Sequence, residues 1–343
     1  MKTRAVIICP GRGTYNAGEL GYLARHHGQR REVLDLFDAI RRAEGQIPLQ
    51  DLDSAEHYDA ELYTRGDTAS GLIFASSFCD ALAISDRYDV VGVTGNSMGW
   101  YSALAVAGAT TPENGFRTAN TMGALMQAHL IGGQSLYPFV DEDWRPVPGR
   151  REDLLALVDE IGTRQNHELA VSIRLGGMLV LAGNEAGLDA FEGQLPKVQG
   201  RFPMRLKNHA AFHTVLQEPV AEQGRAALPQ SLFQIAQTPL VGGCGEVWWP
   251  GEYSVEALRD YTLNAQVVTP YDFTSAIRVA ARTFAPDVFI ITGPGTTLGG
   301  AVAQSLIAIN WRGLTDKAGF LALQATDPVL LSMGRAEDRT RVT

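Results

Sequence analysis

The chain has 343 residues, with 29 Lys and Arg against 38 Asp and Glu, and a formal net charge of −9. This acidic balance excludes a protein that binds nucleic acid through a dominant basic surface. With 45% hydrophobic residues and 36 glycines, the composition also excludes a disordered or collagen-like chain. The length predicts one large α/β domain with a smaller unit inserted or appended.

The cysteines and the apolar segments indicate the cellular compartment in which the protein is expected. Cys9, Cys79 and Cys244 lie far apart and match neither a disulfide framework nor a zinc-ligand spacing. The apolar run at 5–9 is shorter than the apolar segment of a secretory signal, and no stretch approaches the length of a membrane span. We therefore expect a cytoplasmic protein with no metal and no membrane contact.

The first part of the chain shows the pattern of a parallel α/β domain. Residues 5–9 form a continuous run of the kind found in a strand buried on both faces, and they lead into the glycine-rich segment 10–13. The further predicted elements are helices at 30–44 and 69–86, a buried strand at 90–94, and helices at 98–108 and 115–131.

The composition changes at residues 137–151, which contain three prolines and predict a boundary loop. The elements expected after it are a helix at 154–161, strands at 169–175 and 178–182 joined by a Gly-Gly turn, a helix at 185–195 and a strand near Met204. This pattern predicts a small ferredoxin-like α+β subdomain at 137–206, inserted into a large α/β-hydrolase-like subdomain with a parallel sheet at 1–136 and 207–315.

The C-terminal part returns to the α/β pattern. Helices are expected at 217–227 and 271–284, and a buried strand at 288–291 leads into Gly293-Pro294-Gly295. After Thr315 no pattern is clear, so residues 316–343 are expected to form a tail with a frayed end.

Residues 95–99, Gly-Asn-Ser-Met-Gly, match the G-x-S-x-G pattern between a predicted buried strand and a predicted helix. A sharp strand-to-helix turn would hold Ser97 at a helix N-terminus, where the N–H of Met98 can donate to an oxyanion. We therefore predict that Ser97 is a nucleophile.

A serine nucleophile needs a base, and the chain has seven histidines. Four are expected to be solvated and a fifth, His129, to cap a helix; the four are His26, His27, His57 and His167. His209 and His213 flank an apolar segment between a strand and a helix, which makes them the best candidates. Position alone does not choose between them, and a buried structural histidine fits equally well.

At this point the residues carry a resemblance. The segment GNSMGWYSALAVAGA resembles the nucleophile segment of malonyl-CoA:acyl carrier protein transacylases, a family that also supplies acyltransferase domains of fatty acid and polyketide synthases. Four more segments resemble that family in the same order: CPGRG at 9–13, AAFHTVLQEPVAE at 210–222, AQVVTP at 265–270 and GPGTTLGG at 293–300. The resemblance extends over roughly residues 5–307.

The resemblance implies roles for individual residues. Ser97 would form an acyl-serine ester, and His213 rather than His209 would be the general base. A backbone carbonyl in the region of Gln266 would orient the imidazole, and the backbone N–H groups of Met98 and Arg12 would form the oxyanion hole. A coenzyme A thioester would be the substrate, with no tightly bound cofactor, and a phosphopantetheine-bearing acyl carrier protein would be the partner.

Three positions depart from the family pattern near the acyl group. The family holds the malonyl carboxylate with an arginine on the helix after the nucleophile helix, and Met122 stands at that position here. A thioether cannot donate to a carboxylate, so Met122 predicts a pocket for a neutral acyl group. Asn96, which stands where the family has a histidine before the serine, is also assigned to the acyl pocket and indicates a reshaped pocket without deciding the substrate. Arg12 replaces a family glutamine, and as an alternative it would serve as a substitute clamp for malonyl.

The leading hypothesis is therefore an acyltransferase that moves a non-malonyl acyl group from coenzyme A, or another carrier, to an acyl carrier protein. The alternatives are a thioester hydrolase or editing enzyme on the same scaffold, a malonyl transferase that uses Arg12, and a non-catalytic binding module. Carrier proteins are acidic, so a basic run before His209 predicts their docking surface, with Arg201, Arg205 and Lys207 as its main residues.

Overall fold

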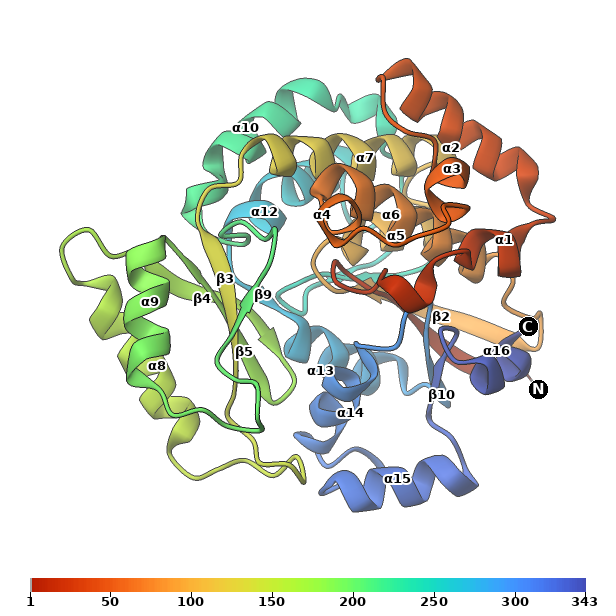
Figure 1. The fold of residues 1–343 in the computed structure, drawn as a ribbon. Helices are drawn as coiled ribbons and strands as arrows, with labels where there is room; N and C mark the ends of the chain where they lie inside the picture. The colour runs from red at the N-terminus through yellow and green to blue at the C-terminus, as the bar shows by residue number, and fades with distance from the viewer. Residues whose placement is uncertain (1) are drawn as a thin grey trace.

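The computed structural model describes residues 2–343 and contains two sheets (Figure 1). The larger sheet has the strand order β11-β10-β1-β2-β7-β8, and every neighbouring pair is parallel except β7 with β8. Its strands are β1 (Thr3–Cys9), β2 (Tyr88–Gly95), β7 (Leu240–Val241), β8 (Val247–Trp248), β10 (Val288–Ile291) and β11 (Leu330–Ser332). This is the predicted large α/β subdomain with a parallel sheet.

The smaller sheet has the order β6-β3-β5-β4-β9. Its elements are β3 (Gly133–Pro138), α8 (Arg150–Gly162), β4 (Leu169–Leu175), β5 (Met178–Gly183), α9 (Glu185–Gln194), β6 (Met204–Leu206) and β9 (Tyr271–Asp272). The first six follow one another as β-α-β-β-α-β, the ferredoxin-like arrangement. Strand β3 begins at Gly133, before the expected boundary at 137, and β9 comes from the returning chain and pairs in parallel with β4.

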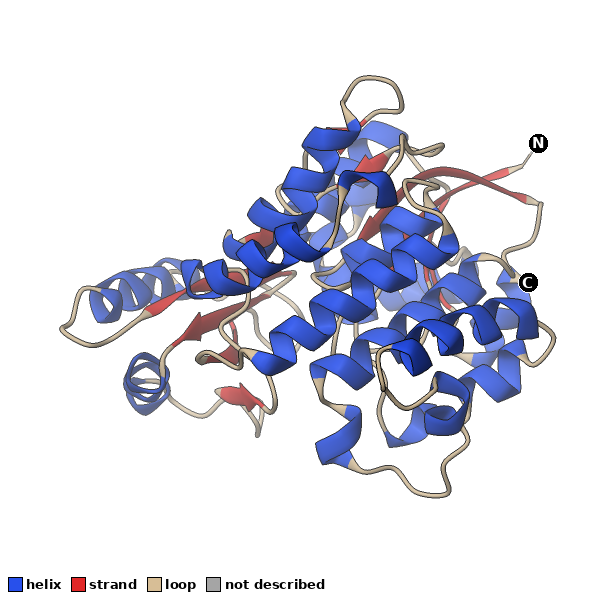
Figure 2. Cartoon of the chain, turned by 90° about the horizontal axis from the view of Figure 1, so that it is seen from above, coloured by secondary structure: helices blue, strands red, loops and turns tan. Residues whose placement is uncertain are grey.

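Helices cover both faces of the larger sheet. Those of the first part are α1 (Tyr22–His27), α2 (Arg31–Ala43), α3 (Leu49–Asp53), α4 (Ala60–Tyr63), α5 (Gly66–Ala81), α6 (Gly99–Val106) and α7 (Pro112–Ala128). Those of the second part are α10 (Glu218–Ala227), α11 (Val255–Asp260), α12 (Gln266–Val268), α13 (Phe273–Phe284), α14 (Gly299–Ile307), α15 (Lys317–Thr326) and α16 (Ala336–Val342). Figure 2 shows many of them packed side by side. Within residues 2–343 no helix combines the length and apolarity that crossing a bilayer requires.

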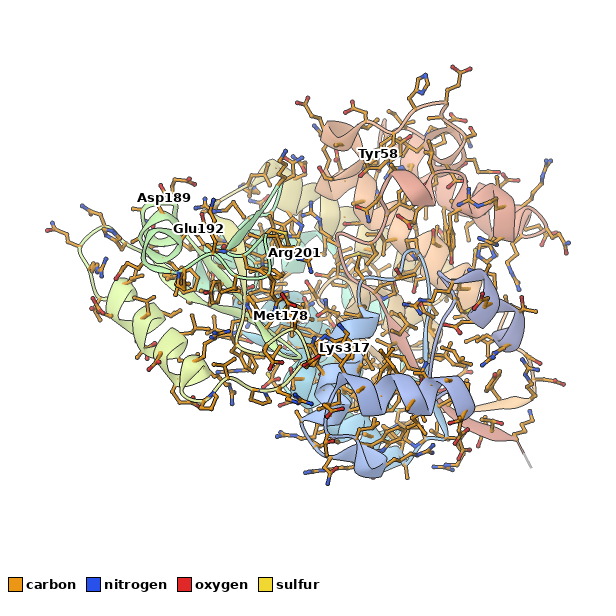
Figure 3. The ribbon with its side chains drawn as sticks, turned by 60° about the horizontal axis from the view of Figure 1, so that its bottom comes forward. Tyr58, Met178, Asp189, Glu192, Arg201 and Lys317 are labelled. Carbon is orange, nitrogen blue, oxygen red and sulfur yellow. The ribbon has the colours of Figure 1, made fainter. Side chains whose placement is uncertain are left out.

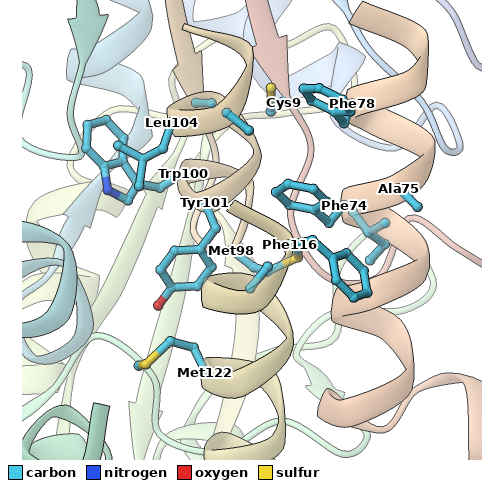
Figure 4. Close-up of a cluster of buried hydrophobic side chains, with 14 of the residues drawn as sticks. Cys9, Phe74, Ala75, Phe78, Met98, Trp100, Tyr101, Leu104, Phe116 and Met122 are labelled. Carbon is cyan, nitrogen blue, oxygen red and sulfur yellow. The ribbon is translucent and has the colours of Figure 1, made fainter. Parts of the chain in front are cut away.

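The side chains of β1 explain why its sequence is apolar without alternation. Ile7 and Cys9 join one hydrophobic cluster, whereas Val6 and Ile8 join a second cluster on the opposite face. Both faces of the strand are therefore buried, as the continuous apolar run predicts. The first cluster also contains Met122, close to Tyr101 in Figure 4.

The prediction of an unpatterned tail after Thr315 was wrong. Residues 317–342 form α15, β11 and α16, and β11 adds an edge strand to the larger sheet, with Phe289 opposite Leu330. The last helix is held by Arg339, whose guanidinium lies 2.7 Å from the buried carboxylate of Asp80. A three-residue strand has too little pattern to be recognised, because its partner strand and the anchor of the following helix are distant in the sequence.

The start of α6 lies directly against β1. A Cβ on Gly99 would be 2.2 Å from the carbonyl oxygen of Cys9, a distance that real Cβ contacts do not reach. This close approach fixes the nucleophile turn against the central strand, and it requires glycine at this position.

We expect Gly99→Ala to lower the free energy of unfolding by about 1–3 kcal/mol, because backbone has to move to admit the methyl group. Urea denaturation measures the change. Gly193→Ala is the matched control, since a Cβ there meets nothing within 4 Å; it should leave stability unchanged or raise it by up to about 1 kcal/mol. A Gly99→Ala protein as stable as the control would contradict the close approach.

Candidate active site

Ser97 lies on the turn between β2 and α6, and its backbone has the left-handed φ of 55°. The neighbouring residues hold this turn: the N–H of Asn96 donates to the Cys9 carbonyl at 3.0 Å, and the N–H of Gly99 donates to the Asn96 carbonyl at 2.8 Å. A non-glycine residue at positive φ is strained and persists only when its surroundings impose it. The predicted strand-turn-helix context of Ser97 is therefore present.

His213 faces the serine. Its Nε2 lies 2.7 Å from the Ser97 Oγ, and its Nδ1 lies 2.8 Å from the backbone carbonyl oxygen of Gln266. The Gln266 side chain makes a second hydrogen bond to the same turn: its Nε2 donates to the Ser97 carbonyl at 3.0 Å. Since a carbonyl only accepts, the proton of a neutral imidazole belongs on Nδ1, and Nε2 is free to accept the serine proton.

The Gln266 carbonyl is available because of Pro270. Helix α12 covers only Gln266–Val268, and the residue four positions after Gln266, which would donate to its carbonyl in a continuing helix, is Pro270. Proline has no N–H. A π-helical turn at Tyr261–Ala265 directly precedes Gln266, a feature that often occurs at functional sites. The local sequence thus leaves one acceptor unused for His213.

Burial sets the proton affinity of His213. The side chain is buried, and burial lowers its pKa from the ordinary 6.5 to about 4, although the hydrogen bond to the Gln266 carbonyl opposes the shift. Burial disfavours the charged imidazolium, so the neutral base is the resting form at neutral pH. An imidazole of this kind can remove the proton of Ser97.

The other histidines occupy different surroundings. His209 lies 2.7 Å from the side-chain oxygen of Gln134, and burial together with the charge of Arg12 holds its pKa well below the usual range. His27 was expected to be solvated, but this was wrong, because it is buried beside Asp80. Within residues 2–343 no group of His, Cys, Asp and Glu side chains has a metal-binding arrangement.

A cavity of about 10 Å³ lies beside Ser97, large enough for one water at most. Its lining consists of Arg12, Ser97, Met98, Tyr101, Met126, Phe212, His213, Gln266 and Val267. An acyl group would have to displace some of these side chains. Sequence reasoning missed Met126, which lies one helical turn after Met122, so the helical repeat alone would have indicated it.

The two predicted acyl-pocket residues are not part of this lining. Met122 is fully buried in the hydrophobic cluster, where a Cβ on Gly224 would be 2.7 Å from its sulfur. Asn96 has a buried side-chain oxygen without a hydrogen-bond partner among the described residues. Their roles in the acyl pocket remain predictions.

Arg12 brings a positive charge to the same cavity. Its Nη2 donates to the carbonyls of Thr64 and, at 2.8 Å, of Asn208, while its guanidinium lies 5.3 Å from the ring centre of Phe212. Its Nε and Nη1 are buried and have no partner among residues 2–343. Burial lowers the Arg12 pKa to about 10, so the group stays charged at neutral pH. Arg12 also lines a neighbouring hollow of about 170 Å³, together with Lys207 and His209.

The predicted oxyanion hole consists of the backbone N–H groups of Met98 and Arg12, and both residues line the cavity beside Ser97. Met98 stands at the N-terminal cap of α6, and in residues 2–343 neither its N–H nor that of Arg12 donates to a protein acceptor. Free N–H groups at a helix N-terminus suit a developing negative charge. Both N–H groups are therefore available for an oxyanion.

The three predicted docking residues differ in their surroundings. The guanidinium of Arg205 lies within 3.0 Å of carboxylate oxygens of Glu185, Asp189 and Glu192. These contacts neutralise Arg205. Figure 3 labels Asp189, Glu192 and Arg201. Arg201 stacks over the Phe202 ring at 4.7 Å, and in the described chain neither Arg201 nor Lys207 has an ion-pair partner.

Known proteins resemble this chain in sequence at a low level of identity. No family model matches the sequence. A curated polyketide synthase for phenolphthiocerol synthesis from Mycobacterium marinum is 27% identical over 320 residues, which cover 88% of this chain but only 14% of that protein. The malonyl CoA-acyl carrier protein transacylase of Bacillus subtilis is 23% identical over 254 residues, 72% of this chain and 74% of that protein.

Solved structures agree with these relatives. The malonyl-CoA:acyl carrier protein transacylase of Xanthomonas oryzae superposes with a TM-score of 0.76 at 19% identity, covering 99% of this chain and 98% of that one. A type II polyketide synthase malonyl transacylase, solved in complex with its acyl carrier protein, gives 0.75 at 18% identity and covers 99% of both chains. The motifs, the sequence relatives and the fold thus agree on one resemblance, to the malonyl-CoA:acyl carrier protein transacylase family.

Proposed function

We propose that the protein is an acyltransferase that moves an acyl group from a coenzyme A thioester to the pantetheine thiol of an acyl carrier protein, through an ester on Ser97. The observation that carries the proposal is the chain of hydrogen bonds from Ser97 Oγ to His213 and on to the Gln266 carbonyl, at 2.7 and 2.8 Å. The names of the relatives support a role in fatty acid or polyketide synthesis.

In the first half-reaction, Nε2 of His213 takes the proton of Ser97 as Oγ attacks the thioester carbonyl. The carbonyl oxygen becomes an oxyanion, and the N–H groups of Met98 and Arg12 donate to it. The carbon–sulfur bond then breaks, the imidazolium returns its proton to the leaving thiolate, and the acyl group stays on the serine as an ester.

In the second half-reaction, the thiol of the carrier protein loses its proton to His213 and attacks the ester. The same N–H groups stabilise the second oxyanion, and Ser97 recovers its proton as it leaves. Two substrates that react in turn at one group give ping-pong kinetics. If water replaces the carrier thiol, the same residues hydrolyse the thioester, which is the hydrolase alternative.

The low pKa of His213 predicts a flat pH profile. The base must be neutral, and its pKa of about 4 leaves it neutral well below the ordinary value of 6.5. We expect kcat/KM for acylation to stay constant from about pH 8 to about pH 5 and to fall only near pH 4. Rapid-quench acylation assays, with circular dichroism to confirm that the fold survives at each pH, measure this. An apparent pKa near 6.5 would contradict it.

For the acyl group we propose a chain that ends in a carboxylate held by Arg12. The support is electrostatic: Arg12 lines the cavity of Ser97, and two of its guanidinium nitrogens, Nε and Nη1, are buried without an acceptor in the described chain. A buried donor without a partner costs about 1–3 kcal/mol. The neutral, non-malonyl acyl group expected from Met122 is the second candidate. The apolar parts of Tyr101, Met126, Phe212 and Val267 in the lining favour it.

An acyl-loading panel distinguishes these candidates. Purified protein is incubated with malonyl-, acetyl- and octanoyl-coenzyme A, and intact mass reports the ester; Ser97→Ala should show none. We expect malonyl to load best and Arg12→Gln to reduce its kcat/KM about 10- to 100-fold, with little effect on acetyl, because one charge-assisted pair is lost. Arg117→Gln, which removes a half-exposed arginine on α7, is the matched control.

Other outcomes of the panel have definite meanings. Preferred loading of acetyl or octanoyl groups, unaffected by Arg12→Gln, would support the neutral acyl group and overturn the Arg12 proposal. Rapid release of free acid without a carrier protein would favour the hydrolase. No ester with any donor would contradict the acyltransferase itself.

The assignment of the carrier-docking residues can also be tested. We propose that Arg201 and Lys207 attract the acidic carrier, whereas Arg205 is already neutralised by three carboxylates. The variant Arg201→Gln/Lys207→Gln should raise KM for the carrier several-fold at low salt and leave acylation by coenzyme A thioesters unchanged. Arg205→Gln, the matched control from the same segment, should change KM less. An equal effect of both variants would contradict this assignment.

A further inference from the structure

Another hollow, of about 490 Å³, lies away from the catalytic cavity, between α1, α16 and the turn after α5. Figure 1 shows α16 at the side of the molecule that also holds α1. The lining of the hollow consists of Arg25, His26, His27, Gln29, Arg30, Ala83, Arg339 and Thr343. None of these residues lines the cavity beside Ser97.

Arginine side chains are concentrated around this hollow. The lining contains three arginines, two histidines and no Asp or Glu. Within residues 2–343, the one carboxylate in ion-pair contact with them is the fully buried Asp80. The whole chain has a net charge of −9, so this group of arginines is a local exception to its acidic character.

Asp80 cannot neutralise this charge, because it already accepts from four groups. Its oxygens lie 2.8 Å from Nε2 of His27, 2.7 Å from Nη2 of Arg339, 2.7 Å from the hydroxyl of Tyr22 and 2.6 Å from the N–H of Gly293. One negative charge is thus shared among all of these donors. Arg25 and Arg30, which also line the hollow, are not among these donors.

Arg25 and Arg30 have no anionic partner at all in the described chain. Arg25 donates to the Leu20 carbonyl at 2.8 Å and Arg30 to the Leu82 carbonyl at 2.7 Å, and both acceptors are neutral. These hydrogen bonds hold the two side chains in place, but no acidic side chain of the described residues pairs with them.

His27 adds a ring nitrogen that has no hydrogen-bond partner among the described residues. It is 1% exposed, and its Nδ1 is buried without a partner among residues 2–343, although the residue lines the hollow. Asp80 occupies the other ring nitrogen, Nε2, at 2.8 Å, so Nδ1 is the ring position left for a polar group in the hollow. Beside it, burial and then the charge of Arg339 lower the pKa of His26 to about 4, which is consistent with a positive field.

We propose that this hollow binds the phosphate group of a small phosphorylated molecule. The three arginines of the lining come from α1, from the segment after α1 and from α16, and several guanidinium groups suit the many oxygens of a phosphate or diphosphate better than the two of one carboxylate. The volume also exceeds what a bare phosphate fills. Such a ligand would join α1 to α16, which come from opposite ends of the chain.

Isothermal titration calorimetry of the full chain with pyrophosphate tests the proposal. We expect saturable binding that weakens with salt, and an affinity at least about tenfold lower in Arg25→Gln/Arg30→Gln, because two charged donors are lost. Arg31→Gln is the matched control, since it removes an exposed neighbour that does not line the hollow. Thermal unfolding confirms that both variants are folded.

Further titrations identify the source of the phosphate. Inorganic phosphate, ADP, coenzyme A and dephospho-coenzyme A are compared in Ser97→Ala protein, in which turnover is absent. Tighter binding of a nucleotide than of inorganic phosphate, lost in the double variant, supports a phosphorylated metabolite; binding of inorganic phosphate and pyrophosphate alone supports free phosphate. No binding, an equal affinity in the double variant, or equal affinity for malonate would overturn the proposal. None of these readouts depends on acyl transfer.

Discussion

The hydrogen bond from His213 to the Gln266 carbonyl is the contact on which the candidate catalytic site depends. A carbonyl orients the imidazole as a carboxylate would, but it carries no full negative charge and does little to stabilise the imidazolium. Burial therefore dominates, and the pKa of His213 falls to about 4. Pro270 makes the arrangement possible by leaving this carbonyl without a helical donor. A base held neutral in this way is ready at any pH near neutrality.

The two sheets together hold the serine in place. From the larger sheet, β1 contacts the turn through the Cys9 carbonyl, which accepts from the N–H of Asn96 and lies against Gly99. From the smaller sheet, Tyr271 of β9 donates its hydroxyl to the Gly95 carbonyl at 2.5 Å, and its ring lies 5.2 Å from that of His213. The strained backbone of Ser97 is thus fixed from both subdomains.

Much of this arrangement could be predicted from the sequence, because its signals are local. The buried strand before Ser97, the glycines around it and the apolar segment before His213 are patterns within a few residues. What could not be predicted depends on distant partners. The edge strand β11 exists because β10 lies beside it. Likewise, His27 reads as a surface residue until the fold brings it against Asp80. The residues taken alone left His209 and His213 equivalent, whereas the family resemblance favoured His213, the one whose Nε2 lies against Ser97.

Arg41 shows why the unmet donors of Arg12 are significant. Both are arginines with much of the side chain buried, but Arg41 donates from Nε to the Ile47 carbonyl at 2.6 Å, and from Nη1 to the Asp67 carbonyl at 2.7 Å and the Asn120 side chain at 2.9 Å. No buried nitrogen of Arg41 lacks a partner among residues 2–343. This fold can therefore satisfy a buried guanidinium with its own acceptors. At Arg12 it does not: Nε and Nη1 are buried without a partner, in a residue that lines the Ser97 cavity, and this contrast is the reason for proposing an anionic group on the substrate as their acceptor.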